Sequence, residues 1–267
     1  MKVFVIDMAK CNGCYGCQLA CKDEHVNNDW MPYAKPQPDT GHFWMRIEET
    51  VHGQVPKVKL EYRPVSCMHC DKPACIEAGN GAVYKREDGL VIIDPVKAEG
   101  NKELVNACPY HTIYWNEELN VAQKCTGCAH LVDEGKLPRC ADFCATGALR
   151  FGEEADFAAE IASAEVLSPE FGQKPRVYYL NLPKLFIGGD VWDRADNEII
   201  ENAVVTLKGE NGCEVSVKTD DFGDFWFKKL SAGNYSLTIE ADGYKSVSVD
   251  HIRLEKSLNL GDFPLEK

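Results

Sequence analysis

The chain has 267 residues, and its 29 lysines and arginines against 42 aspartates and glutamates give a formal net charge of −13. This length allows one or two domains, and 45% hydrophobic residues are typical of a globular chain. The acidic charge argues against a nucleic-acid-binding surface, and no stretch approaches the roughly 18 consecutive apolar residues of a membrane span. Residues 1–7 contain neither a secretory apolar region nor a twin-arginine signal, so we expect a cytoplasmic protein.

Cysteines dominate the first half of the chain, beginning with a C-x₂-C-x₂-C-x₃-C run. In bacterial ferredoxins, the first three cysteines of such a run bind one 4Fe–4S cluster and the fourth reaches a second cluster. Gly13 and Gly16 leave room for backbone amides to approach the sulfur atoms, because glycine has no Cβ. The run therefore predicts a cluster-binding loop followed by a helix, with the thiols Cys11, Cys14, Cys17 and Cys21.

Residues 22–66 form a long proline-containing insertion to which the sequence assigns no detailed structure. We expect its aromatic residues Trp30, Phe43 and Trp44 to pack either on the clusters or on a partner subunit.

Three further runs follow in chain order. The first contains Cys67, Cys70 and Cys75, and Cys108 stands before Pro109 as in ferredoxins. The last run is C-x₂-C-x₁₁-C-x₃-C, formed by Cys125, Cys128, Cys140 and Cys144. Twelve of the 13 cysteines thus lie between Cys11 and Cys144, and we expect the other, Cys213, to lie in a loop without a role.

Three alternatives to 4Fe–4S clusters compete for these cysteines. Disulfides suit small secreted domains and not a chain of this size that lacks a signal. Zinc sites use C-x₂-C pairs but have no use for the third cysteine of the first run. A Rieske centre built from Cys67, His69, Cys108 and His111 would leave Cys70 and Cys75 without a role, so we expect both histidines to be polar neighbours of a cluster.

A comparison of the runs with one another divides the cysteines among clusters. The frame K-C-x-G-C occurs at residues 10–14 and 124–128, and a third copy at residues 97–101 keeps its lysine and glycine but lacks both cysteines. Continuing the ferredoxin spacing places Leu104 where a third cysteine belongs, and Gly79 where the run of Cys67 would have its fourth. The residues in place of cysteine are Gly79, Ala98, Asn101 and Leu104, which by the crossing rule are the full ligand set of one cluster.

The remaining twelve cysteines divide into three sets of four, which predicts three 4Fe–4S clusters. The sets are Cys11, Cys14, Cys17 with Cys144; Cys125, Cys128, Cys140 with Cys21; and Cys67, Cys70, Cys75 with Cys108.

This order of runs resembles the iron–sulfur electron-transfer subunits of the dimethyl-sulfoxide-reductase family of molybdopterin enzymes. The resemblance covers roughly residues 1–182 and includes the segments Lys22–Glu24, Lys85–Gly89, Ala107–Tyr110 and Pro175–Leu180. It implies a doubled bacterial-ferredoxin fold over residues 1–182, with residues 22–66 as an insertion. It also implies a heterodimer with a large catalytic subunit, which alone would carry molybdenum and molybdopterin guanine dinucleotide.

Two departures from the family pattern are visible. The family usually has four clusters, whereas one is deleted here, and Ala145 replaces the proline usual after the last cysteine. A missing cluster lengthens one electron-transfer step, which is expected where the overall reaction needs no external electrons. Within the family, that situation is found in an enzyme that moves a hydroxyl group between polyphenols, and this chain is similar to its small subunit.

Between the cysteine runs and the C-terminal part, the stretch Glu153–Ala162 predicts a helix. Its acidic residues in the first turn suit the helix dipole, and Phe157 and Ile161 lie on one face, where we expect them to anchor the helix to the cluster domain.

Residues 183–267 show short alternating runs separated by glycines, which predict a small all-β antiparallel sandwich or barrel, so the whole chain is expected to be α+β. The patterns Thr219–Phe227, Leu230–Leu237 and Ala241–Tyr244 resemble the collagen-adhesin B-type or carboxypeptidase regulatory-like module. We expect the module to pack or dock, with Phe225, Trp226 and Tyr235 as core and strand-face residues and not as carbohydrate-binding ones.

The leading hypothesis is an electron-transfer subunit of a molybdopterin transhydroxylase, without an active site of its own. Four thiolates per cluster leave no iron open to a substrate, and motifs such as G-x-S-x-G, H-E-x₂-H and a Walker A sequence are absent. Two alternatives stay open: an electron wire for another molybdopterin reductase or dehydrogenase, and a scaffold whose clusters are redox-silent.

Overall fold

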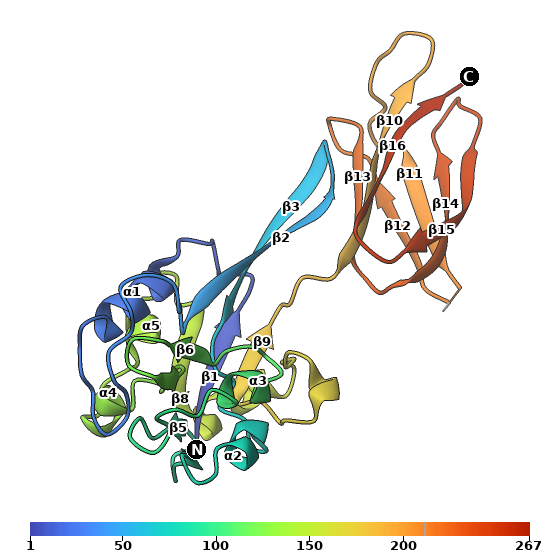
Figure 1. The fold of residues 1–267 in the computed structure, drawn as a ribbon. Coiled ribbons are helices and arrows are strands. Elements are labelled where there is room, and N and C mark those ends of the chain that lie inside the picture. Colours follow the sequence, from blue (N-terminus) through green and yellow to red (C-terminus); the bar gives the residue numbers. More distant parts are fainter. Residues whose placement is uncertain (211) are drawn as a thin grey trace. The chain divides into compact units, whose positions relative to one another are not determined.

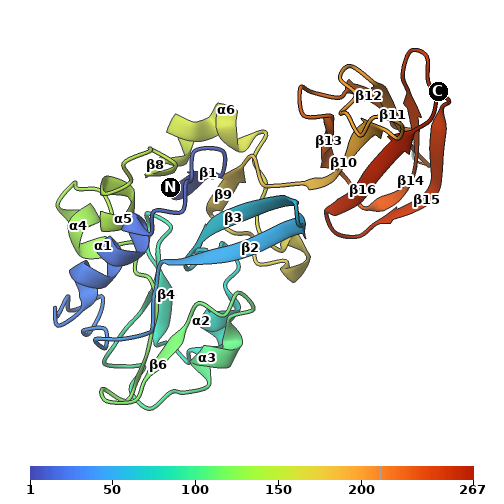
Figure 2. The ribbon, with the colours of Figure 1, turned by 90° about the horizontal axis from the view of Figure 1, so that it is seen from above.

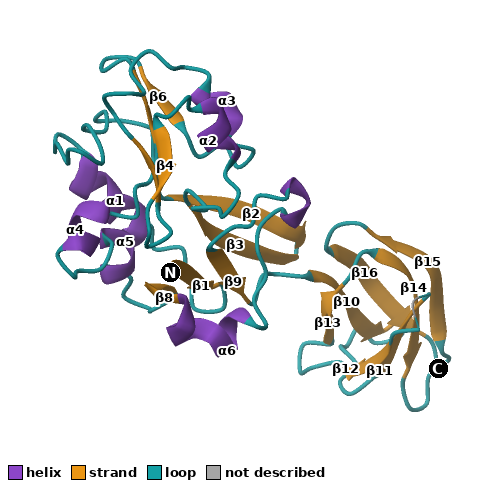
Figure 3. Cartoon of the chain, turned by 90° about the horizontal axis from the view of Figure 1, so that it is seen from below, coloured by secondary structure: helices purple, strands orange, loops and turns teal. Residues whose placement is uncertain are grey.

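The computed structural model describes residues 1–210 and 212–267, and these form two compact units. The first unit comprises Met1–Glu49 and Tyr62–Leu182, and the second comprises Thr50–Glu61 and Pro183–Lys267. In the described part of the chain, every helix belongs to the first unit, which also has short strands, and the second unit is built from strands alone (Figures 1 and 3). The α+β class expected from the sequence is therefore confirmed at this level.

A three-stranded sheet with the order β8–β1–β9 organises the first unit. β1 (Lys2–Asp7) is central, pairing antiparallel with β8 (Leu149–Glu153) and parallel with β9 (Val177–Leu180). The apolar run from Val3 to Ile6 is buried, as expected of a strand covered on both faces. Two short ribbons complete the strands of this region: β4 (Val83–Lys85) with β5 (Val91–Ile93), and β6 (Tyr114–Asn116) with β7 (Val121–Gln123).

Short helices connect these strands. α1 (Gly16–His25) is the longest and starts after Tyr15, whose φ of 59° ends the preceding loop in the left-handed conformation. The others are α2 (Ala74–Ala78), α3 (Leu104–Ala107), α4 (Ala129–Asp133), α5 (Arg139–Asp142) and α6 (Ala158–Ile161), with 3₁₀ turns η1 (Glu154–Phe157) and η2 (Pro169–Phe171).

The helix expected over Glu153–Ala162 is shorter than the sequence suggests. η1 and α6 are one turn each and contain no buried residue, so no apolar face stabilises a longer continuous helix. Phe157 nevertheless packs on β8, since a Cβ built on Gly152 would lie 3.0 Å from its ring, and the Arg150 guanidinium lies 5.3 Å from the ring centre.

The insertion between residues 22 and 66 contains a long hairpin of β2 (Arg46–Gln54) and β3 (Lys57–Val65), visible in Figure 2. The end of this hairpin, Thr50–Glu61, belongs to the second unit, and the rest belongs to the first. Trp44, two residues before β2, is 1% exposed in the core of the first unit, which also contains Cys17 and Cys21, and its ring centre lies 4.7 Å from that of His25.

Two sheets form the second unit, with the orders β13–β10–β16 and β12–β11–β14–β15. Both contribute to one apolar core that includes Val191, Val205, Phe225 and Tyr235, so the core role expected for Phe225 and Tyr235 is confirmed. The strands are β10 (Leu185–Asp193), β11 (Val204–Gly209), β12 (Glu214–Lys218), β13 (Asp224–Leu230), β14 (Gly233–Glu240), β15 (Val247–Leu254) and β16 (Leu258–Leu265).

The expectation of a purely antiparallel domain was wrong in one place. β16, the last strand, runs parallel to β10, the first, with Ile187 opposite Leu258 and Asp193 opposite Leu265. If each strand paired only with a strand of opposite direction, all neighbours would be antiparallel. Here the last strand, β16, lies beside the first strand, β10, and both run in the same direction. Alternating hydrophobicity predicts that a segment is a strand and does not reveal its partner.

Candidate iron–sulfur sites

The loops that carry the cysteine runs share one backbone conformation. The glycines of the three K-C-x-G-C frames, Gly13, Gly100 and Gly127, have φ angles of 69°, 74° and 65°. In this conformation the Gly127 N–H lies 3.3 Å from the Cys125 sulfur, and the Gly13 N–H bonds the Cys11 sulfur in the same way. The copy at residues 97–101, which lacks cysteines, keeps the left-handed glycine, but the Gly100 N–H donates to the Asn120 carbonyl oxygen at 2.9 Å and not to a sulfur.

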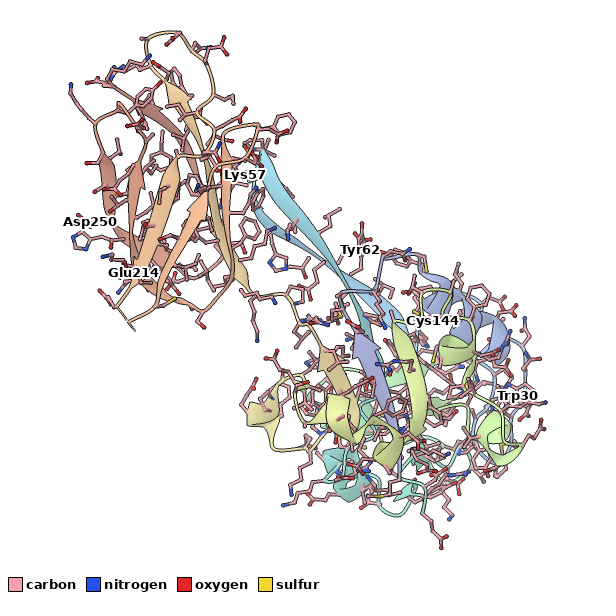
Figure 4. All side chains as sticks on the ribbon, turned by 180° about the vertical axis from the view of Figure 1, so that it is seen from behind. Trp30, Lys57, Tyr62, Cys144, Glu214 and Asp250 are labelled. Carbon is pink, nitrogen blue, oxygen red and sulfur yellow. The ribbon has the colours of Figure 1, made fainter. Side chains whose placement is uncertain are left out.

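Cys11, Cys14, Cys17 and Cys144 form what we call the first thiol group. β1 leads into the loop of Cys11, and Cys144 lies shortly before β8, so the antiparallel pairing of Ile6 with Leu149 brings both segments to one end of the sheet. Burial, followed by the charges of Cys11, Cys144 and Cys14, raises the pKa of the Cys17 thiol to about 12. Cys14 is exposed, so this group lies near the surface, where Figure 4 labels Cys144.

Cys21, Cys125, Cys128 and Cys140 form the second thiol group. Cys21 on α1 meets Cys140 because α1 and α5 pack together, and Cys125 and Cys128 precede α4. Burial, followed by the charge of Cys125, raises the pKa of Cys128 to about 12. The pKa of Cys140 is raised by burial and by the charges of Cys128, Cys21 and Cys125, so these four sulfur atoms face a common space.

Cys67, Cys70, Cys75 and Cys108 form the third thiol group. Cys67 and Cys70 follow β3, and contact between α2 and α3 brings Cys75 to Cys108, which ends α3. All four line a cavity with about 340 Å³ of atom-free space. Burial raises the pKa of Cys70, and the charges of Cys67, Cys108 and Cys75 add to the effect.

The three thiol groups lie in a row. Cys17 of the first group and Cys21 of the second are one turn apart on α1. Burial raises the pKa of Cys125, and the second cause is the charge of Cys67 from the third group. The second and third groups are therefore neighbours. The second thiol group therefore stands between the other two.

An apolar core occupies the place where a fourth ligand set is missing. Ala98 and Leu104 are fully buried in a cluster of aliphatic side chains that includes Val83, and Asn101 donates a hydrogen bond to the Ala78 carbonyl oxygen at 3.4 Å. A Cβ on Gly79 would lie 2.6 Å from Val83 Cγ2 and 2.9 Å from the Cys75 carbonyl oxygen. Close packing has thus replaced the four expected ligands.

Comparison with known proteins agrees with this geometry. A family model described as a 4Fe-4S dicluster domain matches residues 58–154, and the carboxypeptidase regulatory-like domain matches residues 187–265. The chain is 45% identical to the pyrogallol hydroxytransferase small subunit of Pelobacter acidigallici, over 96% of each chain. A tetrathionate reductase subunit of Salmonella typhimurium is 33% identical over 68% of this chain and 73% of its own length. A sulfite dehydrogenase subunit of Allochromatium vinosum is 31% identical over 77% of this chain and 94% of its own length.

The chain belongs to the iron–sulfur electron-transfer subunits of molybdopterin oxidoreductases. The family expected from the cysteine runs is thereby confirmed, as is the order of an iron–sulfur domain followed by a regulatory-like β domain. The relatives are each named as one subunit or chain of a larger enzyme. Among the described residues, no helix is long and apolar enough to cross a membrane.

The donor atoms fit the 4Fe–4S clusters of such an iron–sulfur subunit. Among the described residues, none of the twelve cysteines of the three groups forms a disulfide, and no three His, Cys, Asp or Glu side chains converge closely enough to bind a single metal ion. Four thiolates that each bind a different iron of one cluster stand farther apart than the ligands of one ion. The ligand role of each cysteine stays a prediction.

Lys124 is a buried cation that the sequence comparison did not single out in this iron–sulfur subunit. It is 2% exposed, and its ammonium group donates to the carbonyl oxygens of Val91 and, at 3.0 Å, of Cys125. Burial lowers the pKa of Lys124, but the charges of Cys67, Cys75 and Cys125 outweigh this effect and leave the pKa raised. A fixed positive charge therefore lies between the second and third thiol groups.

His25 is a second residue that sequence reasoning missed. It lies four residues after Cys21, on the same face of α1, and that spacing is the signal that could have indicated it. Its Nε2 is 3.6 Å from the Cys128 sulfur, and burial lowers the pKa of its imidazole to about 3, so the ring is neutral. His130, whose Nε2 is 2.9 Å from a Glu24 carboxylate oxygen, lies edge-on beside it and stacks on Trp30 at 4.1 Å.

Proposed function

We propose that this chain is the iron–sulfur subunit of a molybdopterin-dependent transhydroxylase that moves a hydroxyl group between polyphenols, from pyrogallol to phloroglucinol. The observation that carries the proposal is the 45% identity to a pyrogallol hydroxytransferase small subunit over 96% of both chains, which includes the β domain. The apolar packing around Ala98 and Leu104 supports it, because a reaction without net electron demand tolerates a shortened wire.

Three 4Fe–4S clusters are assigned to the three thiol groups: Cys11, Cys14, Cys17 and Cys144; Cys21, Cys125, Cys128 and Cys140; Cys67, Cys70, Cys75 and Cys108. Each such cluster accepts and releases one electron at a time. The chain's own part is to bind the iron through thiolates, to bury it, and to set its potential through hydrogen bonds and nearby charge. The row of groups supports transfer along a single line.

The active site is assigned to the partner. Each thiol group would satisfy its cluster with four sulfur ligands, so no iron on this chain would be open to a polyphenol. Molybdenum with molybdopterin guanine dinucleotide is accordingly expected in the large subunit of a heterodimer. The exposed Cys14 marks the first thiol group as the end of the row that is nearest the surface.

A different large subunit is the second candidate. Tetrathionate reductase and sulfite dehydrogenase subunits share about a third of their aligned residues with this chain, which supports a wire for a sulfur-compound oxidoreductase. Both relatives match less of this chain than the hydroxytransferase subunit does. An assay of the complex with pyrogallol, tetrathionate and sulfite separates these possibilities.

The deciding experiment is a metal analysis of the native complex, purified without oxygen. About twelve iron atoms and about one molybdenum per copy support the proposal, and pyrogallol transhydroxylation is then the first activity to measure. About sixteen iron atoms would mean that a fourth cluster is present. Zinc in place of iron would contradict electron transfer altogether.

A redox titration tests the alternative of silent structural clusters. Electron-transfer clusters change their absorption and electron paramagnetic resonance spectra within the range of roughly −700 to +450 mV that protein clusters cover. Clusters that neither take up nor release an electron in that range would favour a scaffold.

A further inference from the structure

His69 occupies a position that the other cysteine loops give to glycine. In Cys67-Met68-His69-Cys70, it stands where Gly13 and Gly127 stand in the C-x-G-C frames, and its φ of 44° is left-handed like theirs. Its backbone N–H also bonds the first sulfur of its run, 3.4 Å from Cys67 Sγ, as the Gly127 N–H does at 3.3 Å from Cys125 Sγ. Glycine would satisfy this backbone more easily, so the imidazole needs a separate explanation.

The imidazole reaches from the third thiol group to the second. His69 is 2% exposed, and its Nε2 lies 3.7 Å from Cys125 Sγ, within the range of an N–H···S hydrogen bond. Its Nδ1 lies 3.0 Å from the Val91 nitrogen and accepts that N–H. A neutral ring that accepts at Nδ1 carries its hydrogen on Nε2, so Nε2 is the donor to the Cys125 sulfur.

The surroundings hold the ring in this orientation. Lys124 donates to the Val91 carbonyl oxygen, and Val91 lies in β5, whose three residues are all buried. Phe4 of the central strand stacks on the other side, with ring centres 6.0 Å apart and planes 20° apart. The imidazole is therefore fixed by a buried strand, an aromatic ring and a hydrogen bond, as a positioning residue must be.

We propose that His69 is a positioning residue that joins the clusters of the second and third thiol groups through hydrogen bonds to Cys125 and Cys67, and raises the reduction potential of the second group's cluster. This inference rests on the proposed function, because it requires clusters in these groups. An N–H···S bond strengthens as negative charge grows on the sulfur, so it favours the reduced cluster. The electron comes from the neighbouring cluster, which is oxidised by the same one electron, and no bond or proton is exchanged.

The test uses the anaerobically purified complex and three substitutions. His69→Asn suits a left-handed φ and keeps an acceptor for Val91, but its side chain is too short to reach Cys125. His69→Gln carries an amide N–H at about the distance of Nε2. His111→Asn is the matched control, because His111 also has a positive φ, of 51°, lies three residues after Cys108, and is exposed.

Reduction is followed by electron paramagnetic resonance during a potentiometric titration, with iron counted in every sample. We expect His69→Asn to lower the equilibrium constant for reduction of one cluster about tenfold, which is about 59 mV for one electron. His69→Gln should restore most of this shift, and His111→Asn should match the unmodified complex. A His69→Asn titration that matches the unmodified complex, or a shift that His69→Gln does not reverse, would overturn the inference.

The iron count keeps the two proposals distinguishable. If the unmodified complex does not contain about twelve iron atoms, the proposed function is wrong and this inference is wrong as well. If the unmodified complex and His69→Gln hold about twelve while His69→Asn loses one cluster, His69 is needed only for assembly, which also overturns its role in setting a potential.

Discussion

At Gly127, two separate constraints act on one residue. Its φ of 65° is left-handed, and a Cβ would lie 2.6 Å from Leu90 Cδ2, in a side chain that is 1% exposed. Gly147 has nearly the same φ, 64°, but a Cβ there would have no described heavy atom within 4 Å. A comparison of substitutions at Gly147 and Gly127 therefore distinguishes the cost of backbone strain from the cost of a steric clash.

Gly147→Ala should lower the free energy of unfolding by about 1–2 kcal/mol, the cost of the left-handed conformation alone. Gly127→Ala should cost about 1–3 kcal/mol more, because Leu90 cannot move aside in a packed core. Thermal unfolding of the iron-loaded protein measures both. Equal losses in the two variants would show that Leu90 yields to the new methyl group.

Residue spacing predicts local chemistry well and long-range burial poorly. The short intervals within each run place neighbouring cysteines on one loop, which is a local property. The fourth cysteine of each set comes from a distant run, and only the crossing rule of ferredoxins predicts it. The lysines of the three frames look alike in the sequence, yet Lys10 and Lys97 have side chains 54% and 66% exposed, whereas Lys124 is 2% exposed between two thiol groups. Only the packing of distant segments distinguishes it.

At the scale of elements, α2 and α3 enclose the apolar core that replaces the missing ligand set. We expect that restoring the four cysteines does not restore a fourth cluster. The combined variant is Gly79→Cys, Ala98→Cys, Asn101→Cys and Leu104→Cys. The Gly79 substitution places a Cβ 2.6 Å from Val83, and loss of the buried Leu104 side chain leaves a cavity that costs about 2 kcal/mol or more.

Iron should stay at about twelve atoms per copy in this variant, and the unfolding temperature should fall. Asn101→Cys alone, at a partly exposed site, is the control and should lower the unfolding temperature only slightly, because it removes one long hydrogen bond, to the Ala78 carbonyl oxygen, and leaves the apolar core filled. A count near sixteen iron atoms would show that the core can open to accept a cluster.

The hairpin of β2 and β3 carries an ion-pair cluster into the second unit. Lys57, labelled in Figure 4, has a side chain 4% exposed, and its Nζ lies 2.7 Å from Asp190 and 2.8 Å from Asp224 on neighbouring strands. Its ammonium also lies 5.3 Å from the centre of the Trp226 ring. The cation therefore offsets the repulsion between two carboxylates that lie side by side.

Lys57→Met should destabilise the second unit by about 2–3 kcal/mol. Removing one partner of a wholly buried ion pair costs roughly 3–5 kcal/mol, and the loss is smaller here because both carboxylates are about a quarter exposed. Hydrogen exchange of the amides in β10 and β13 measures the loss, and Lys59→Met, on an exposed residue of β3, is the control. In the folded unmodified protein, burial and the side-chain hydrogen bond with Asp224 already raise the pKa of Asp190.

Burial raises the pKa of Asp224, but its hydrogen bonds with Asp190 and Lys57 outweigh this effect and leave that pKa lowered. Without the ammonium, the pKa of Asp190 should rise further above its unfolded value. A raised carboxyl pKa contributes stability below the unfolded pKa and loses it as the pH rises through the folded value. The deficit of Lys57→Met should therefore shrink as the pH falls from 7 to 5. A deficit that is independent of pH would attribute the loss to packing and not to charge.

The same hairpin marks the limit of prediction at the scale of elements. Residues 22–66 could not be assigned from the sequence, because β2 and β3 alternate polar and apolar residues without a clear buried face. Their partners are also distant: the Gln54 side-chain oxygen accepts the Asn259 N–H at 2.8 Å, 205 residues away. Short alternating runs predicted the strands of the C-terminal part, but their pattern does not show that residues 50–61 complete that unit.

At the scale of the whole molecule, the second unit is discontinuous in the sequence, so a truncation after Leu182 removes most of it and leaves Thr50–Glu61 behind. The remaining hairpin end would expose Lys57 without its carboxylates and Gly53 without Phe186, whose ring lies 2.6 Å from the position of a Gly53 Cβ. We expect residues 1–182 alone to aggregate, since unpaired strand ends with uncovered surface promote association.

A second truncated chain tests this explanation. In it, an Asn-Gly turn also replaces Thr50–Glu61 and links Glu49 to Tyr62. This chain should stay monomeric and retain about twelve iron atoms, because the three thiol groups lie wholly in the first unit. Light scattering and iron analysis compare the two chains. If both chains aggregate equally, the uncovered hairpin end is not the cause, and if neither aggregates, the hairpin end needs no cover.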